Sequence, residues 1–413
     1  MLKIENIVLA AHKLEGVVIH TPLQYNAQLS EEFECSIYLK REDLQVVRSY
    51  KLRGAYHKIS SLSPEEQQRG VVCASAGNHA QGVAYACQKL NISGTIFMPA
   101  TTPSQKLNQV MLFGKDKIRI ILSGDTFDDA NRQAVLYCEE HKACFVHPFD
   151  DEKVMEGQGT VGKEILDDAT FPVDYLLLPV GGGGLAAGVS SYFSRLSPET
   201  KILGIEPEGA ASMQLSIQNG YNTELCQLDK FVDGAAVKRV GDKTFEICRE
   251  TLDGMLLVPE GKVCTTILNL YNQQAIVVEP AGALTVSALD LIREKIKGKN
   301  VVCVLSGSNN DILRTAEIRE RSLQYEGLKH YFVIRFPQRA GALKEFVGSV
   351  LGPQDDIVHF EYMKKNNREN GPALIGIELK ERGDLFPLKD RLSRLGFQFE
   401  YLNGNDNLLQ FLI

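Results

Sequence analysis

Residues 71–90 read Val-Val-Cys-Ala-Ser-Ala-Gly-Asn-His-Ala-Gln-Gly-Val-Ala-Tyr-Ala-Cys-Gln-Lys-Leu. The short apolar run Val71–Ala74 predicts a buried strand, and the segment from Asn78 to Leu90 predicts a helix. A turn of small and polar residues lies between them. A strand so short and apolar, followed at once by a helix, is typical of a parallel sheet that is covered on both faces.

The same alternation of short strands and helices continues along the chain. We predict strands over 95–98, 118–122, 144–147, 175–180, 202–206 and 300–305, and helices over 104–113, 127–141 and 185–195. A long helical stretch is expected over 263–297, interrupted near Pro280. The pattern predicts two α/β subdomains with a cleft between them. Both lie in a unit of residues 1–311, whose small subdomain spans about 45–143.

The hydrophobic period changes beyond residue 330. Residues 312–328 are rich in charged residues and helix-prone, and we interpret them as a connector. Strands are then predicted over 331–336, 357–363, 373–379 and 397–402, and helices over 342–351 and 385–395. The order β-α-β-β-α-β is the ferredoxin-like arrangement, so residues 329–413 are expected to form a small separate α+β domain.

The composition is that of an ordinary globular chain, with 413 residues, 44% hydrophobic residues and a net charge of -7. This charge gives no reason to expect a nucleic acid or an anionic membrane as a partner. No apolar run is long enough for a transmembrane helix, and residues 1–16 read as an amphipathic helix, not a signal peptide. The nine cysteines include no C-x-x-C pair. We therefore expect reduced thiols and a cytoplasmic location.

Four consecutive glycines, Gly181, Gly182, Gly183 and Gly184, join a predicted strand to the helix that begins at Leu185. Glycine lets backbone N–H groups approach an anion, and a helix N-terminus favours negative charge. No Gly-Lys-Ser/Thr follows, so the run is not a P-loop. A tight strand-to-helix turn is the alternative, but it would need only one or two glycines. The run therefore predicts a phosphate cradle.

Two more polar segments follow predicted strands. Ser75, Ala76, Gly77, Asn78 and His79 form one, and the other is Ser-Gly-Ser-Asn, which begins at Ser306. The N–H groups of the first suit a substrate carboxylate, although a plain helix N-cap explains it equally well. In open α/β sheets, ligands bind beyond the carboxyl ends of the strands. Both segments and the glycine run fall at such ends, which predicts one shared site.

Lys51 lies in the segment Arg-Ser-Tyr-Lys-Leu-Arg-Gly-Ala over residues 48–55, ahead of a helix that we predict over 55–62. An isolated lysine is usually a solvated surface charge. The small residues around Lys51 and the predicted phosphate cradle make it a candidate for a Schiff-base amine. Such an amine must be neutral, so its pKa must be lowered by burial or by nearby cations.

In these four motifs the chain resembles the fold-type II pyridoxal-phosphate (PLP) enzymes, and among them the biosynthetic threonine dehydratases. The motifs occur in the same order over nearly the whole chain. The resemblance implies that Lys51 is the Schiff-base lysine, that Asn78 contacts the PLP ring hydroxyl and that Ser306 lies at the pyridine nitrogen. It also implies that residues 181–185 surround the phosphate and that residues 75–79 bind the substrate.

The resemblance implies β-elimination of L-threonine, with L-serine as a secondary substrate, to 2-oxobutanoate and ammonia in a homotetramer. A catabolic serine/threonine dehydratase, a serine racemase and a non-catalytic amino-acid sensor are the alternatives. Racemases of this fold carry a second serine where this chain has Ala76, and alanine cannot donate a proton. The family's metal site would fall at Glu206, Ala210 and Ser212. The last is usually an aspartate, so we predict no metal.

The C-terminal segment resembles the ACT-like regulatory domain of the short threonine dehydratases, in a single copy. The stretch Pro337–Leu343 resembles the ligand loop that lies between the first strand and the first helix of such a domain. The resemblance implies feedback inhibition by isoleucine, opposed by valine, in the first step of isoleucine synthesis. The alternative is that this domain only assembles the oligomer.

Overall fold

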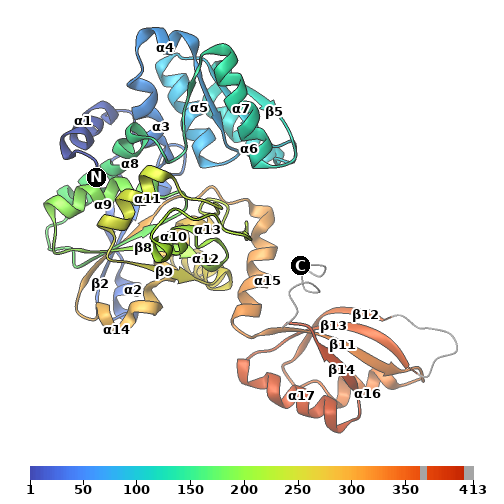
Figure 1. Cartoon of the computed structure of the whole chain (residues 1–413). Coiled ribbons are helices and arrows are strands. Elements are labelled where there is room, and N and C mark those ends of the chain that lie inside the picture. The colour runs from blue at the N-terminus through green and yellow to red at the C-terminus, as the bar shows by residue number, and fades with distance from the viewer. Residues whose placement is uncertain (363–369, 404–413) are drawn as a thin grey trace. The chain divides into compact units, whose positions relative to one another are not determined.

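The structure is a computed structural model that describes residues 1–362 and 370–403. The chain divides into two compact units, Met1–Asp311 and Ile312–Ile413 (Figure 1). The first unit holds two largely parallel sheets, and the second holds an antiparallel sheet. The predicted α/β fold with a C-terminal α+β domain is confirmed.

The larger sheet of the first unit has six strands. Their order is β1 (Leu23–Tyr25), β2 (Ser36–Arg41), β10 (Asn300–Leu305), β7 (Tyr175–Pro179), β8 (Lys201–Pro207) and β9 (Gly254–Val258). Every neighbouring pair is parallel except β1 with β2. Helices α8 (Glu152–Asp168) and α9 (Gly184–Leu196) contribute to its main apolar core. The central strands β10 and β7 are almost wholly buried, as their continuous apolar sequences predict.

The smaller sheet, in the upper lobe of Figure 1, has four parallel strands. Their order is β5 (Ile118–Leu122), β4 (Gly94–Met98), β3 (Val71–Ala74) and β6 (Cys144–Phe145). The helices of this lobe are α3 (Lys51–Ser60), α4 (Pro64–Arg69), α5 (Asn78–Leu90), α6 (Ser104–Gly114) and α7 (Phe127–His141). Two separate apolar clusters line the sheet. One includes residues of α3, α5 and α6, and the other includes residues of α7, so both faces are covered.

The start of one helix of the first unit differs from the prediction, whereas the interruption predicted near Pro280 is confirmed. Helix α3 begins at Lys51, four residues earlier than expected, because Leu52 and Arg53 face the interior. The helical stretch predicted over 263–297 is divided into α12 (Glu260–Gln274), α13 (Pro280–Ser287) and the short α14 (Arg293–Ile296). Ala275 ends α12 with a φ of 54°, in the left-handed region, and Pro280 can begin a helix but not continue one.

Several elements were not predicted from the sequence pattern. They are α2 (Ala27–Glu32), α4, α8, α10 (Ser212–Asn219), α11 (Asp242–Thr251), β1, β2 and β9. The N-terminal amphipathic helix was predicted and is α1 (Ile4–Leu14). Among the described residues, no helix combines the length and apolar character needed to cross a membrane.

The second unit begins with α15 (Thr315–Tyr325) and continues as a β-α-β-β-α-β fold. Its elements are β11 (Lys329–Pro337), α16 (Ala342–Ser349), β12 (Asp356–Tyr362), β13 (Asn370–Glu378), α17 (Leu385–Arg394) and β14 (Gln398–Tyr401). The antiparallel sheet has the order β12-β13-β11-β14. Apolar side chains of this sheet pack against α16 and α17 in one core, which confirms the ferredoxin-like prediction.

A buried ionic network fixes the start of α3 in the first unit. The Arg53 guanidinium, 1% exposed, donates to Glu42 at 2.7 and 2.8 Å and to Glu164 at 2.7 and 2.8 Å. Lys40 Nζ lies 2.6 Å from the second Glu164 oxygen. Burial alone would raise the pKa of Glu164, but the charges of Arg53 and Lys40 outweigh it, and the pKa is lowered. The network joins α3, β2 and α8.

We expect Arg53→Ala to lower the free energy of unfolding of the first unit by about 3–5 kcal/mol, because two buried carboxylates lose their main partner. Urea denaturation followed by circular dichroism measures this loss. Arg132→Ala is the control, since Arg132 is 68% exposed in its pair with Asp129, and it should leave stability nearly unchanged. Equal effects of the two substitutions would contradict this account of the network.

Candidate active site

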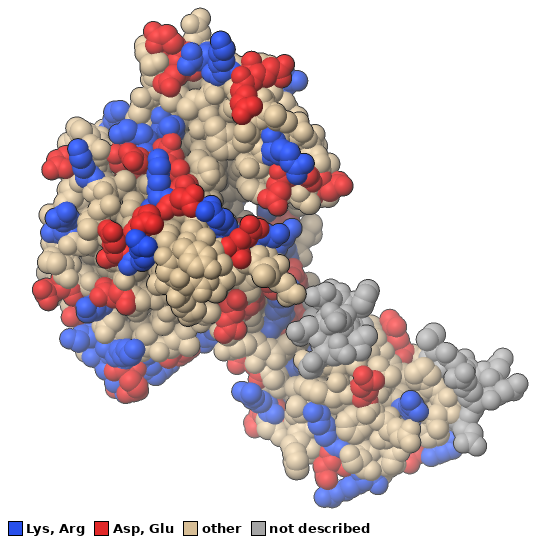
Figure 2. Space-filling model, viewed as in Figure 1, with Lys and Arg blue, Asp and Glu red and all other residues tan. Residues whose placement is uncertain are grey.

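The segment before Lys51 runs beside the loop that follows β10. Tyr50 N–H donates to the Ser306 carbonyl at 3.2 Å, and Ser308 N–H donates to the Arg48 carbonyl at 2.9 Å. Ser49 and Gly307 form a bridge between the two segments. Lys51, at the first position of α3, therefore lies next to the carboxyl end of a central strand. The surface is hollowed between the two lobes of the first unit (Figure 2).

The Lys51 amine is partly buried and, among the described residues, has one hydrogen-bond partner, the Pro148 carbonyl at 2.9 Å. It also lies 5.2 Å from the centre of the Tyr50 ring. Burial lowers the pKa of Lys51 to about 8, although the nearby Glu279 carboxyl opposes this change. About a tenth of the amine is therefore neutral at pH 7 and about half at pH 8, far more than for an exposed lysine, and the neutral form is the one that a nucleophile or general base requires.

The glycine run lies between β7 and α9. Within the described residues, the backbone N–H groups of residues 181–185 donate no hydrogen bond. Gly183 has a φ of +91°, a conformation that favours glycine, and a Cβ on Gly182 would lie 2.2 Å from the Phe149 ring. The run thus meets a packing requirement and also presents free donors at a helix N-terminus, which suits a phosphate group.

Phe149 connects the glycine run to Lys51. Its backbone and side chain lie against Gly182 and Gly184, and the preceding Pro148 carbonyl accepts the hydrogen bond from Lys51. The amine and the free N–H groups are therefore held by one short segment. The sequence patterns gave no indication of Pro148 or Phe149, because their role depends on contacts with residues distant in the chain.

Asn78, the first residue of α5, links the two lobes. Its Nδ2 donates to Glu279 Oε1 at 2.6 Å, and its Oδ1 accepts from Asn309 Nδ2 at 2.7 Å. Glu279 immediately precedes α13, and Asn309 follows Ser306 by three residues. These two bonds orient the Asn78 amide and leave its second Nδ2 hydrogen available to a ligand.

The remaining residues of the run 75–79 contribute mainly backbone groups. Ser75 Oγ accepts from Gly77 N–H at 3.2 Å. The N–H groups of Ala76, Asn78 and His79 donate no hydrogen bond within the described residues. The His79 side chain points elsewhere, because its Nε2 donates to the Val146 carbonyl at 2.8 Å. Burial lowers the pKa of His79 to about 3, so the ring is neutral.

Ser306 is buried directly after β10, and its hydroxyl makes no hydrogen bond with the described residues. The structure thus brings Lys51, Asn78 and Ser306 close together, with the glycine run reached through Phe149. A neutral amine, a row of free N–H groups and a free hydroxyl fit the aldehyde, the phosphate and the ring nitrogen of PLP respectively.

Glu279 is the main site residue that the sequence analysis missed. Its carboxyl is buried, and desolvation, reinforced by the charge of Asp233, raises its pKa to about 7. A glutamate before a proline that starts a helix reads as an ordinary N-terminal residue. Contacts with distant segments connect it to the site: its carboxylate accepts from Asn78, 201 residues earlier, and its N–H donates to the Gly307 carbonyl at 3.1 Å.

The expected position of the family's metal site holds a different arrangement. Glu206 is buried and accepts N–H bonds from Met213 at 2.7 Å and Gln214 at 2.9 Å, at the N-terminus of α10. Burial raises the pKa of Glu206 to about 8. Across residues 1–362 and 370–403, no three His, Cys, Asp or Glu side chains gather closely enough to hold a metal ion.

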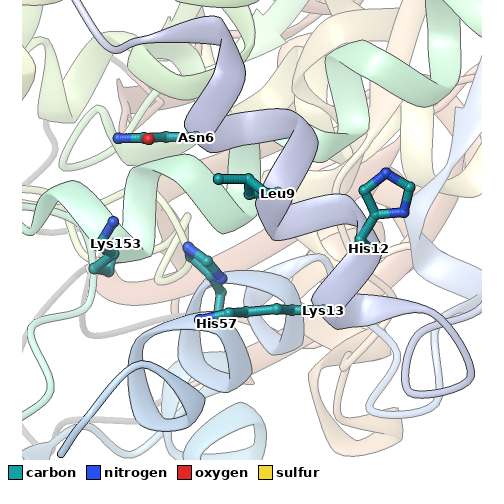
Figure 3. A pocket seen from close by; sticks show the side chains of 6 residues that line it. All are labelled: Asn6, Leu9, His12, Lys13, His57 and Lys153. Carbon is teal, nitrogen blue, oxygen red and sulfur yellow. The ribbon is translucent and has the colours of Figure 1, made fainter.

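A cavity of about 310 Å³ lies away from these residues, between α1, α3 and α8 (Figure 3). It is lined by Asn6, Leu9, His12, Lys13, His57 and Lys153. None of the predicted site residues lines it. The chemistry that the motifs indicate therefore belongs at the strand ends, where Lys51 lies.

Glu279→Gln should change how the stability of the cofactor-free protein depends on pH. The folded protein holds the Glu279 proton up to about pH 7, whereas the unfolded chain releases it near 4.5. Wild-type stability relative to the variant should therefore fall by roughly 3 kcal/mol as the pH rises from 4.5 to 7, and then stay level. Urea denaturation across this range measures it. If the difference in free energy of unfolding between the wild type and Glu279→Gln did not vary with pH, the raised pKa of Glu279 would be wrong.

Comparison with known families agrees with the two units. Residues 14–307 match the family of pyridoxal-phosphate dependent enzymes, and residues 320–412 match the C-terminal regulatory domain of threonine dehydratase. The biosynthetic L-threonine dehydratase IlvA of Halalkalibacterium halodurans is 60% identical over 412 residues, covering 100% of this chain and 99% of its own. The Bacillus subtilis IlvA is 57% identical over 413 residues, covering 100% of this chain and 98% of its own.

Solved structures resemble the catalytic part of the chain. Threonine deaminase isoform 2 of Solanum lycopersicum superposes with a TM-score of 0.73 at 40% identity, over 78% of this chain and 94% of that one. The serine racemase of Dictyostelium discoideum gives 0.70 at 31% identity, over 75% and 99%. With full-length relatives at this level of identity, the chain belongs to the biosynthetic threonine dehydratase family of PLP-dependent enzymes.

Proposed function

We propose that the chain converts L-threonine to 2-oxobutanoate and ammonia, with L-serine as a secondary substrate. The observation that carries the proposal is the Lys51 amine, whose pKa is lowered to about 8 beside unengaged N–H groups and the oriented Asn78 amide. The full-length relatives named as biosynthetic threonine dehydratases support the choice of substrate.

In this proposal, Lys51 would hold PLP covalently, and the N–H groups of residues 181–185 would bind its phosphate. Asn78 would donate its free amide hydrogen to the ring hydroxyl, and the Ser306 hydroxyl would contact the ring nitrogen. When bound, PLP withdraws electrons from the substrate carbon that carries the amino group. The N–H groups of Ala76, Asn78 and His79 hold the substrate carboxylate in place.

The neutral Lys51 amine removes the proton from Cα of threonine. The β-hydroxyl then leaves from the neighbouring carbon. One water molecule is lost in this elimination and one is consumed when ammonia is released, so threonine yields 2-oxobutanoate and ammonia. Ala76 offers no proton to the opposite face of Cα. This absence favours elimination over the racemase alternative, although the fold is shared with serine racemases.

The same proposal assigns the second unit to regulation. Isoleucine binding to residues 329–413 would inhibit the first step of isoleucine synthesis, and valine would oppose it, in a cytoplasmic homotetramer. The match to a threonine dehydratase regulatory domain supports this assignment over a role in assembly alone. Thermodynamic coupling is reciprocal, so threonine should weaken isoleucine binding by the same factor as isoleucine weakens threonine binding.

Lys51→Ala should abolish 2-oxobutanoate formation, because the variant lacks both the covalent attachment and the base that removes the Cα proton. A coupled assay of 2-oxoacid from L-threonine measures the loss. Borohydride reduction should fix PLP to the wild type but not to the variant, while the phosphate contacts still allow noncovalent binding. Turnover retained in Lys51→Ala would refute the mechanism.

PLP uptake by the cofactor-free protein should accelerate with pH and level off above about 8, because only the neutral Lys51 amine attacks the aldehyde. Below that pH, the rate constant should rise about tenfold per unit. Stopped-flow absorbance measures the uptake. An exposed lysine would show no plateau below pH 10, and that result would show that the site does not lower the pKa of the amine.

A further inference from the structure

The cavity of about 310 Å³ between α1, α3 and α8 lies outside the candidate active site (Figure 3). Its volume is at the lower end of the range for small-molecule sites, about 300–1,000 Å³. Lysine, histidine and asparagine side chains form the polar part of the wall, and Leu9 forms the apolar part. Among the described residues, no aspartate or glutamate lines the cavity. A wall of this kind suits a ligand that carries negative charge.

One buried carboxylate behind the wall holds three of its groups in place. Glu156, on α8, accepts from Asn6 Nδ2 at 2.7 Å and from Lys153 Nζ at 2.8 Å. It also accepts from His57 Nε2 at 3.2 Å. Burial alone would raise the pKa of Glu156, but these hydrogen bonds outweigh it and lower the pKa to about 2. The ionised carboxylate therefore orients one side chain from each of α1, α3 and α8.

His57 has a ring nitrogen that the protein leaves without a partner. Its side chain is 3% exposed and extends from α3 into the space beside Lys153 and Leu9 (Figure 3). Nε2 carries a hydrogen, because the ionised Glu156 can only accept. Nδ1 is buried and has no hydrogen-bond partner among the described residues. Such atoms are uncommon in folded proteins, and an anion in the cavity would accept from Nδ1 when the ring carries its second hydrogen.

Two lysines give the cavity an excess of positive charge. Lys13 Nζ donates to Ser61 Oγ at 3.1 Å and has no carboxylate partner among the described residues. Lys153 is 42% exposed, and its bond to Glu156 uses one of its three hydrogens. Two ammonium groups therefore stand against the single charge of Glu156, and both keep hydrogens for a ligand.

The donors approach from three helices, which favours a phosphate group over a carboxylate. Lys13 lies on α1, His57 on α3 and Lys153 on α8. A carboxylate offers two oxygens in one plane, whereas a phosphate group offers three strong acceptor oxygens and a charge of about -1.5 to -2. Lysine binds phosphate well as a point charge. His12, which also lines the cavity, is already paired with Glu15 at 2.9 Å.

We propose that this cavity binds a phosphate group, either as inorganic phosphate or as part of a small phosphate monoester. Lys13 and Lys153 pair with its charge, and His57 donates to it through Nδ1. Leu9 contacts the carbon chain of a monoester. The site is distinct from the glycine run 181–184 and does not depend on the proposed reaction. A ligand held here joins α1 and α8 to α3, the helix that begins at Lys51.

The test measures binding to the full-length, PLP-loaded enzyme, so that the cofactor already occupies the glycine run. Isothermal titration with inorganic phosphate and with glycerol 3-phosphate gives the two affinities. Lys13→Gln removes one charge from the cavity. Lys163→Gln is the matched control, because Lys163 lies on α8, pairs with Asp167 and does not line the cavity. We expect Lys13→Gln to weaken binding about tenfold or more, and Lys163→Gln to leave it unchanged.

His57→Gln tests the ring nitrogen separately. The glutamine amide can still donate to Glu156, but it has no group in the place of Nδ1, so binding should weaken about tenfold. Should this variant unfold, the exposed Lys13 still provides the test. Tighter binding of glycerol 3-phosphate assigns a monoester, and equal or tighter binding of inorganic phosphate assigns the free ion.

Two results would overturn the proposal. The first is a wild type that binds neither probe at about 10 mM. The second is a loss of affinity in Lys163→Gln as large as that in Lys13→Gln, since binding would then follow the overall charge of the protein and not this cavity.

Discussion

The close contact between α3 and α8, and the buried charges that accompany it, are the constraint on which the catalytic unit depends. A Cβ on Gly54 would lie 2.7 Å from the Val154 carbonyl, and one on Gly157 would lie 2.5 Å from the Arg53 carbonyl. The two backbones therefore touch, and only glycine permits it. Arg53, held by Glu42 and Glu164, fixes the rotation of α3. Because Lys51 lies two residues before Arg53, the same network fixes the amine.

The site itself is notable for groups that the protein leaves without partners. The N–H groups of residues 181–185 and the Ser306 hydroxyl make no hydrogen bond in the described structure. Polar groups without partners are uncommon in folded proteins, so their concentration at one cleft is a sign of a ligand. Burial also changes the ionisable groups of the site. It lowers the pKa of Lys51 and raises that of Glu279, and so favours the neutral form of each.

Much of the fold could be predicted from the sequence, because buried strands and helix periods are local signals. The strands at 71–74, 118–122 and 300–305 occur at the predicted residues, and so does the helix 78–90. The start of α3 was misplaced, because its limit is set by contacts of Arg53 with distant residues. Helix α8 was missed for a related reason: its glycines weaken the local helical signal, and their value lies in packing against α3 and α9.

In the site, too, local sequence signals could be predicted and contacts between distant segments could not. Ser75 and Ser306 could be predicted to lie near a ligand, because each follows the carboxyl end of a parallel strand, β3 in the smaller sheet and β10 in the larger sheet. Glu279, Asn309 and Phe149 could not be placed, because each acts through a contact between segments far apart in the chain. The roles assigned to Lys51 and Asn78 remain predictions that the geometry supports and that experiment must test.

The most direct test of the account is the formation of 2-oxobutanoate from L-threonine by the purified chain, measured with and without added PLP and L-isoleucine. The account predicts turnover that requires PLP and that isoleucine suppresses. Turnover that isoleucine leaves unchanged would retain the reaction and remove the feedback assignment. No 2-oxoacid from threonine or serine, with PLP bound to the protein, would contradict the central claim.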